Sequence, residues 1–328
     1  MKNKIAFEEH FATEDTLEQT RPYAGDSGQW DVFARRLLDL GDERLDGMAR
    51  NGIEFAILSL NSPGAQAIPD KAEALRIAMR ANDTMADAVF AHPDHYAAFA
   101  ALPMHDPDVA SEELTRCVRE LGFKGAMLNG FQQKDTADSA FYYDFPEYRS
   151  FWATVSELDV PVYLHPRLQI PSQAYNYAGH PWLMSAPWGF AVETSIHALR
   201  LCGSGIFDEY PNLRIVLGHL GENIPYGLSP RAYRGKRLLG EYFRDHFHIT
   251  TSGNFSDPAF RCALEIMGAD RLYFSADYPF EAMEDGACWF DATTVINEEE
   301  RLRIGRTNAI ELFGLELDTA SPAMAASR

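Results

Sequence analysis

The sequence predicts one α/β domain, a (β/α)8 TIM-like barrel with long loops over the carboxyl-terminal face of its strands. Short apolar runs rich in β-branched and aromatic residues recur along the chain, and stretches with helical periodicity lie between most of them. These runs are almost continuously hydrophobic, which is typical of parallel strands that are buried on both faces. There are eight runs, and eight such units close into a barrel.

Strands and helices are expected to alternate along the chain. The strands are expected at 4–10, 53–60, 96–102, 124–130, 160–166, 214–220, 247–253 and 271–279. The helices are expected at 42–51, 71–91, 109–121, 146–157, 192–206, 257–268, 284–292 and 297–314.

Some segments fall outside this alternation. Segments 11–41 and 167–191 are too long to be simple connections, and such long loops are usually lids or binding loops. No internal repeat or composition break marks a second domain. We therefore expect residues 1–315 to form the barrel and the small, polar segment 316–328 to be disordered.

Composition and charge narrow the classes of partner. The formal charge of -19 argues against nucleic acid or an anionic membrane, because either partner would need a basic face. No apolar stretch reaches the roughly 18 to 20 residues that span a bilayer, and the first residues lead into a strand rather than a signal peptide. We expect a cytoplasmic protein. Its four cysteines have no C-x-x-C spacing and are expected to be small buried hydrophobic residues.

Polar residues gather where the expected strands end, which is where barrels of this kind build their active sites. Glu8 and His10 lie two residues apart on the first strand, so both face the barrel axis, while Glu9 faces the helix layer or solvent. His165 and Asp277 end the fifth and eighth strands at the same mouth.

One histidine at a strand end is more often structural than a ligand, but burying this whole group without a partner would be costly. Mixed nitrogen and oxygen donors suit Zn²⁺ or Mn²⁺. We therefore predict one divalent metal per chain, held by Glu8, His10, His165 and Asp277.

The ordered motifs resemble the amidohydrolase-2 branch of the amidohydrolase superfamily, most closely its non-oxidative hydroxybenzoate decarboxylases. The similar segments, spread over nearly the whole chain, include KIAFEEHFA, ILSLNSPGAQAI, LGFKGAMLNG, LDVPVYLHPR, RIVLGHLGE, ITTSGNF and DRLYFSADYPFE. Hydrolases of the superfamily usually begin with His-x-His, whereas Glu8-x-His10 is similar to the decarboxylase form. His10 places the chain near the γ-resorcylate (2,6-dihydroxybenzoate) type.

The resemblance implies a carboxy-lyase that converts a small ortho-hydroxybenzoate into CO₂ and a phenol. It implies that Glu8, His10, His165 and Asp277 surround the metal, and that His219, braced by Glu222, stands beside the substrate. Asp277 would protonate the ring carbon, either through a raised pKa or with a proton acquired from the substrate. No organic cofactor is expected, because the ortho oxygen and the metal accept the electron density.

One segment departs from the family pattern. A Trp-Arg-containing helix typically follows Gly-His-x-Gly-Glu-x-x-Pro, but here Tyr226 is followed by the shorter GLSPRAYRGKRLLGEYF. Arg231 or Arg234 could replace the missing guanidinium as a substrate contact. The other expected pocket walls are Tyr23, Asn129, His180, Trp182, Trp188 and Phe190.

Two alternative functions stay open. A metal-dependent hydrolase, or another metal-barrel chemistry that includes oxygen-using reactions, could act on a related small carboxylate. A barrel without catalytic activity could serve as a binding or assembly partner. The aromatic loop 167–191, together with the oligomeric state of similar barrels, favours a homodimer or homotetramer.

Overall fold

All eight expected strands are present in the computed structural model, which describes residues 1–23, 29–229, 233–234 and 236–317. The strands are β1 (Lys4–Phe11), β2 (Ile53–Leu60), β3 (Tyr96–Ala98), β4 (Ala100–Ala101), β5 (Ala126–Asn129), β6 (Val162–His165), β7 (Ile215–Leu217), β10 (Phe247–Thr250) and β11 (Leu272–Tyr273). β3 and β4 are two halves of the expected strand 96–102, interrupted at Phe99.

These strands are parallel and surround one interior. They pair in the orders β1-β2-β3 and β4-β5-β6-β7-β10-β11. The two runs meet at Phe99, whose amide donates to Leu58 O over 2.9 Å, while the amide of Ala100 donates to Gly125 O. At the other seam the amide of His10 donates to Tyr278 O over 2.8 Å. The predicted (β/α)8 barrel is therefore confirmed.

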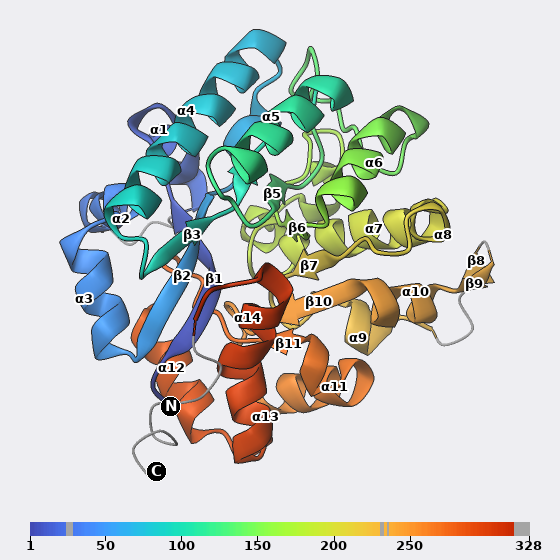
Figure 1. The fold of residues 1–328 in the computed structure, drawn as a ribbon. Helices are drawn as coiled ribbons and strands as arrows, with labels where there is room; N and C mark the ends of the chain where they lie inside the picture. The colour runs from blue at the N-terminus through green and yellow to red at the C-terminus, as the bar shows by residue number, and fades with distance from the viewer. Residues whose placement is uncertain (24–28, 230–232, 235, 318–328) are drawn as a thin grey trace.

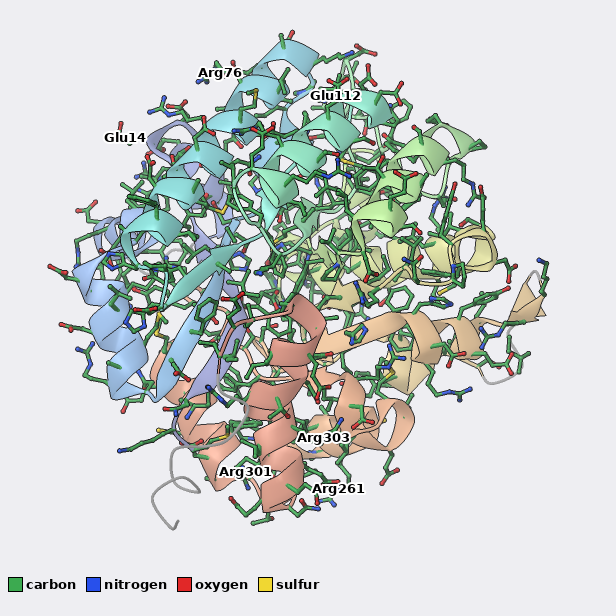
Figure 2. All side chains as sticks on the ribbon, viewed as in Figure 1. Glu14, Arg76, Glu112, Arg261, Arg301 and Arg303 are labelled. Atoms are coloured by element: carbon green, nitrogen blue, oxygen red, sulfur yellow. The ribbon has the colours of Figure 1, made fainter. Side chains whose placement is uncertain are left out.

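Helices surround the strands (Figure 1). The helices expected from the sequence are α3 (Asp42–Arg50), α4 (Lys71–Ala91), α5 (Pro107–Arg119), α6 (Arg149–Leu158), α7 (Gly189–Gly203), α11 (Asp257–Met267), α12 (Met283–Ala292), α13 (Glu298–Leu302) and α14 (Asn308–Phe313). The last two helices are joined by a π-helical turn at Arg303–Thr307. The charged side chains of Glu14, Arg76 and Glu112 project outward from this helical layer (Figure 2).

Several short elements were not expected. Segment 11–41 contains α1 (Glu14–Thr20) and α2 (Trp30–Leu38), and α8 (Ile206–Glu209), α9 (Ile224–Gly227) and α10 (Leu239–His246) precede the later strands. β8 (Tyr233–Arg234) and β9 (Arg237–Leu238) form an antiparallel pair. α10 runs directly into β10 at Phe247. Because no Gly or Pro stands between them in the sequence, the boundary gave no signal.

The barrel interior is a packed core whose amino-terminal end is closed by α14. Phe313 of α14 meets Phe7 of β1 edge to face, with ring centroids 4.9 Å apart. Phe7 also contacts Phe99 and Tyr163, which extend the same core toward the opposite end of the strands. The polar mouth of the barrel therefore lies at the carboxyl ends of the strands, above this aromatic floor.

A β-bulge in β1 explains how an apolar strand ends in acidic side chains. Ala6 pairs with Ala56 and Glu9 pairs with Leu58, so β1 has one more residue than β2 over this stretch. The amides of Phe7 and Glu8 both donate to Oγ of Ser275. The extra residue lets Phe7 pack in the core while the next residue, Glu8, faces the mouth.

Glu9 lies in the seam between β1 and the segment that follows β11. Its side chain is buried, so of the two expected surroundings, the helix layer or solvent, solvent is excluded. Oε1 of Glu9 accepts hydrogen bonds from the amide of Ala276, over 3.0 Å, and from Oγ of Ser275. Burial raises the pKa of Glu9 to about 8. Glu9 thus ties β1 to the backbone next to Asp277.

Other expectations concern membranes, cysteines and the tail. Within the described residues, no helix is both long and apolar enough to cross a bilayer. All four cysteines are free thiols, but only Cys117 and Cys202 are buried, so the expectation of burial fails for Cys288, which is exposed. The predicted disordered segment 316–328 lies outside the described residues from position 318 onward.

Candidate metal centre and substrate cavity

Four predicted ligands meet at the mouth of the barrel. Glu8 and His10 extend from β1, His165 is the last residue of β6, and Asp277 follows β11. All four side chains are buried, and one ligand atom from each lies within 4.8 Å of the others. Nε2 of His10 is 3.3 Å from Oδ1 of Asp277, and Nε2 of His165 is 3.4 Å from Oε1 of Glu8.

The donor set fits a divalent cation. Oε1 of Glu8 is buried and has no hydrogen-bond partner among the described residues. Burial raises the pKa of Glu8 and lowers the pKa of His165 well below its usual range, so the His165 imidazole is neutral. A cation would offset the cost of burying two carboxylates, and a neutral imidazole is the form that binds a metal.

Three hydroxyl groups surround the other oxygen of Glu8. Oε2 accepts hydrogen bonds from Tyr163 of β6, from Ser252, and from Oγ1 of Thr250 at 3.1 Å. A Cβ atom at Gly218 would lie 2.7 Å from the same oxygen, so a side chain cannot fit there. The hydroxyl groups therefore occupy Oε2 and leave Oε1 for a cation.

The ring of His10 is held by a partner on β2. Oγ of Ser59 lies 3.1 Å from Nδ1 of His10, which leaves Nε2 facing Asp277. Outer partners of this kind orient a metal-binding histidine. The sequence contained a signal for part of this support: Tyr163 lies two residues before His165, and Thr250 lies two residues before Ser252, so each pair shares a strand face.

His219 lies beside the ligand group, and Glu222 orients it. Nδ1 of His219 donates to Oε1 of Glu222 over 2.9 Å, and its Nε2 is 3.6 Å from Oδ2 of Asp277. Burial opposes protonation, but the carboxylates of Glu222 and Glu8 outweigh it and raise the pKa of His219 well above its usual range.

The backbone around this histidine is strained. His219, Glu222 and Asp277 have φ values of 51°, 59° and 66°. These values lie in the left-handed region, which residues other than glycine rarely adopt. Such strain concentrates at functional sites. Gly253 is also left-handed, and a Cβ atom there would lie 2.9 Å from the ring of His219.

Asp277 was expected to become protonated either because its pKa is raised or because it acquires a proton from the substrate. The pKa of Asp277 is not raised. Burial opposes its ionisation, but the imidazoles of His10 and His219 outweigh burial and hold the pKa of Asp277 below its usual range. Of the two expected routes, acquisition of a proton from the substrate is the one that agrees with this direction.

Two adjoining cavities open next to the ligand group. The smaller, about 170 Å³, is lined by Ser62, His165, Pro166, Ser185, Ala186, Phe190, His219, Asp277, Phe280 and Glu281. The larger, about 280 Å³, shares Ala186, Phe190, His219, Asp277 and Glu281 and extends to Trp188 and Tyr226. Of the pocket walls expected from the sequence, Trp188 and Phe190 line these cavities. Ser62, Phe280 and Glu281 were missed.

The remaining expected pocket residues are placed differently. Asn129 is buried and donates to Leu60 O over 3.1 Å, and it is absent from the linings of both cavities. His180 is exposed, lies against Trp182 with ring centroids 6.4 Å apart, and is also absent from both linings.

The predictions for the side chains of Tyr23, Arg231 and Arg234 lie outside the described residues. Tyr23 ends the turn Arg21–Tyr23, but its side chain is outside the described part of the chain, as is all of Arg231. The backbone of Arg234 belongs to β8, and the β8–β9 pair lies at the outer rim beyond α10 (Figure 1).

A (β/α)8 barrel whose strand ends gather two carboxylates and two imidazoles around one point defines a metal-dependent enzyme. The family model described as amidohydrolase matches residues 36–315. The chain therefore belongs to the amidohydrolase family.

Similar proteins of this family are decarboxylases. The chain is 49% identical to γ-resorcylate decarboxylase of Rhizobium sp. (strain MTP-10005), over 96% of this chain and 99% of that protein. It is 50% identical to the same enzyme of Rhodococcus jostii (strain RHA1), over 96% of this chain and 100% of that protein.

Solved structures extend the comparison to ligands. A crystal structure of 2,6-dihydroxybenzoate decarboxylase complexed with 2,6-dihydroxybenzoate superposes with a TM-score of 0.93 and 50% identity, over 96% of this chain and 100% of that chain. A dihydroxybenzoic acid decarboxylase from Polaromonas sp. JS666, with bound manganese and the inhibitor 2-nitroresorcinol, gives a TM-score of 0.93 and 47% identity. That match covers 97% of this chain and 98% of the other.

Proposed function

We propose that the protein is a metal-dependent, non-oxidative decarboxylase that converts 2,6-dihydroxybenzoate or a close ortho-hydroxybenzoate into CO₂ and a phenol. The observation that carries this proposal is the buried group of Glu8, His10, His165 and Asp277 beside a ring-sized cavity. Full-length identity of about half to γ-resorcylate decarboxylases supports the same reaction.

Glu8, His10, His165 and Asp277 would hold one divalent cation, Mn²⁺ or Zn²⁺, and we propose no organic cofactor. When bound, the cation would neutralise the carboxylate and phenolate oxygens of the substrate and stabilise the negative charge that develops on them. The three hydroxyl groups on Oε2 of Glu8 would keep its other oxygen in place for the cation.

Asp277 would deliver the proton that replaces the carboxylate group on the ring. It would take this proton from the ortho hydroxyl group as the substrate binds, and then donate it to the ring carbon that carries the carboxylate. The carbon–carbon bond then breaks, its electron pair returns to the ring, and CO₂ leaves. One proton from solvent restores the phenol. The place of Asp277 in both cavity linings supports this role.

His219 and Glu222 would position the substrate. The His219–Glu222 hydrogen bond fixes the imidazole with its Nε2 toward Asp277. An imidazolium at this place would attract the carboxylate of the substrate, while Trp188 and Phe190 would cover the ring from the loop side and limit access of water.

The test is release of CO₂ from a panel of hydroxybenzoates, with the metal-free protein as control. We expect CO₂ and the matching phenol from 2,6-dihydroxybenzoate only when Mn²⁺ or Zn²⁺ is supplied. Hydrolysis of an ester or amide by the metal-loaded protein, with no CO₂ from any acid of the panel, would favour the hydrolase alternative.

Assembly and location complete the proposal. We propose that residues 1–315 act as one unit in a homodimer or homotetramer, because loop 167–191 exposes Tyr175, Trp182 and Trp188 to solvent. A molecular mass near 36.8 kDa by light scattering at micromolar concentration would contradict this assembly. The four free thiols and the acidic charge support a cytoplasmic location, which fractionation of cells would test.

A further inference from the structure

Ser62 is a buried polar residue without a partner at the wall of the substrate cavity. It follows the end of β2, the residue is 3% exposed, and its Oγ has no hydrogen-bond partner among the described residues. It lines the same 170 Å³ cavity as His165 and Asp277. An unpaired buried hydroxyl group costs free energy, so this group is expected to bond when a ligand fills the cavity.

Neighbouring hydroxyl groups differ from Ser62 because they already have partners. Oγ of Ser59, three residues earlier, is within 3.1 Å of Nδ1 of His10. Oγ of Ser185, on the opposite loop and in the same cavity lining, donates to Trp182 O over 3.1 Å. Among these three serines, Ser62 is the one whose hydroxyl group is left for a ligand.

The position of Ser62 determines which part of a ligand it would meet. In the strand order, β2 and β7 lie across the mouth from each other, with β3, β4, β5 and β6 between them on one side. His219 follows β7 and Ser62 follows β2, so a flat ring in the cavity would lie between them. A dry cavity of about 150 Å³ accommodates benzene, so a cavity of about 170 Å³ holds one ring with little additional water.

We propose that Ser62 is a specificity-determining residue that binds the second ortho hydroxyl group of a 2,6-dihydroxybenzoate. This inference rests on the proposed function, because it names which hydroxybenzoates the same site prefers. In this proposal one ortho hydroxyl group would share the cation with the carboxylate, and the second would lie on the other flank of the carboxylate, away from the cation. Ser62 can both donate to and accept from this group, while Phe190 and Phe280 in the same lining cannot.

The experiment compares substrates with one and two ortho hydroxyl groups in wild type and Ser62→Ala. We expect the ratio of kcat/KM for 2,6-dihydroxybenzoate to that for 2-hydroxybenzoate to fall about 3- to 10-fold in Ser62→Ala, the effect of one neutral hydrogen bond. Metal affinity should not change. Ser204→Ala is the control, because this serine is absent from both cavity linings and its hydroxyl group already donates to Leu201 O over 2.8 Å, so the ratio should stay as in wild type.

A binding measurement without turnover separates this inference from the proposed function. Calorimetry would compare 2-nitroresorcinol, with two hydroxyl groups, and 2-nitrophenol, with one, on the manganese-loaded proteins. A loss of discrimination in Ser62→Ala supports the inference even if wild type releases no CO₂, which is the result that defeats the proposed function. An unchanged affinity ratio in Ser62→Ala, or an equal loss for both ligands, overturns the role of Ser62.

Discussion

The hydroxyl group of Tyr163, in the middle of β6, donates a hydrogen bond to Oε2 of Glu8 on β1. Two residues later, β6 ends in His165, whose Nε2 lies 3.4 Å from Oε1 of the same carboxylate. One strand thus supplies both a proposed ligand and the hydroxyl group that holds a second proposed ligand on another strand. The aromatic floor of the barrel and the metal centre are linked through this tyrosine, whose ring packs against Phe7.

Replacing Tyr163 by phenylalanine should weaken metal binding while the fold is kept. Loss of an outer hydrogen bond to a ligand typically lowers metal affinity about 10- to 100-fold. Titration with a competing chelator would measure this, and excess metal should restore most of the activity. Tyr148→Phe is the matched control, because that buried hydroxyl group bonds to Met104 O, away from the metal centre. Equal metal affinity in Tyr163→Phe and wild type would contradict the orienting role.

Replacing His165 by alanine should remove most of the metal. The protein is expected to copurify with about one divalent cation per chain, because four ligand atoms lie within 4.8 Å of one another. Elemental analysis of the purified variant measures the loss. His95→Ala, an exposed histidine outside the centre, is the control that should keep the metal. Full occupancy in His165→Ala would show that other residues hold the cation.

Replacing Asp277 by asparagine should separate proton delivery from metal binding. The amide has nearly the same shape, so the fold should remain and the other ligands should bind metal when it is supplied in excess. Turnover should fall about 10²- to 10⁴-fold, because general acid catalysis contributes that much. The assay is CO₂ release at saturating metal, with exchange of the ring hydrogen of the phenol in deuterated water. Activity within a few-fold of wild type would make Asp277 a ligand only.

Stability should decrease as the pH is lowered, because the buried His248, which is not one of the four proposed ligands, has a lowered pKa. Burial, with Arg271 and Arg214 nearby, lowers the pKa of His248 to about 3, whereas the unfolded chain has a pKa of about 6.5. Between these values only the unfolded state binds the proton, so the free energy of unfolding decreases as the pH falls below about 6.5.

The variant His248→Gln should lose part of this pH dependence. Between pH 6.5 and pH 5 the wild type should lose about 1 to 2 kcal/mol more stability than the variant. Urea unfolding at the two pH values measures the difference for both proteins. The same loss in both would show that His248 does not titrate in this way.

The sequence was sufficient for the strands and for the four residues that meet at the proposed metal centre, because both depend on short-range patterns. Apolar runs marked the strands, and the strand ends marked Glu8, His10, His165 and Asp277. Glu8 and His10 share a face as expected, but the sequence could not show that a bulge lets Phe7 and Glu8 both turn inward. That bulge depends on Ser275, which is 267 residues away from Glu8 in the chain.

The walls of the cavity were harder to predict because they come from loops whose positions depend on distant contacts. Trp188 and Phe190 were predicted because they are aromatic residues of a long loop. The sequence around Ser62 and Phe280 has no pattern that marks these residues as cavity walls. His180 belongs to the same aromatic loop, but it lies outside both linings. The helix α10 was missed because no Gly or Pro separates it from β10, and β8 and β9 were missed because strands of two residues are too short to show a periodic pattern.

The central claim is metal-dependent decarboxylation, and its most direct measurement is the CO₂ released when the purified chain is mixed with 2,6-dihydroxybenzoate, before and after manganese is supplied. The account predicts that the metal-free protein is inactive and that the manganese-loaded protein releases one CO₂ for each 1,3-dihydroxybenzene formed. No CO₂ from the manganese-loaded protein, with the cation bound in a one-to-one ratio and the fold intact, would contradict it.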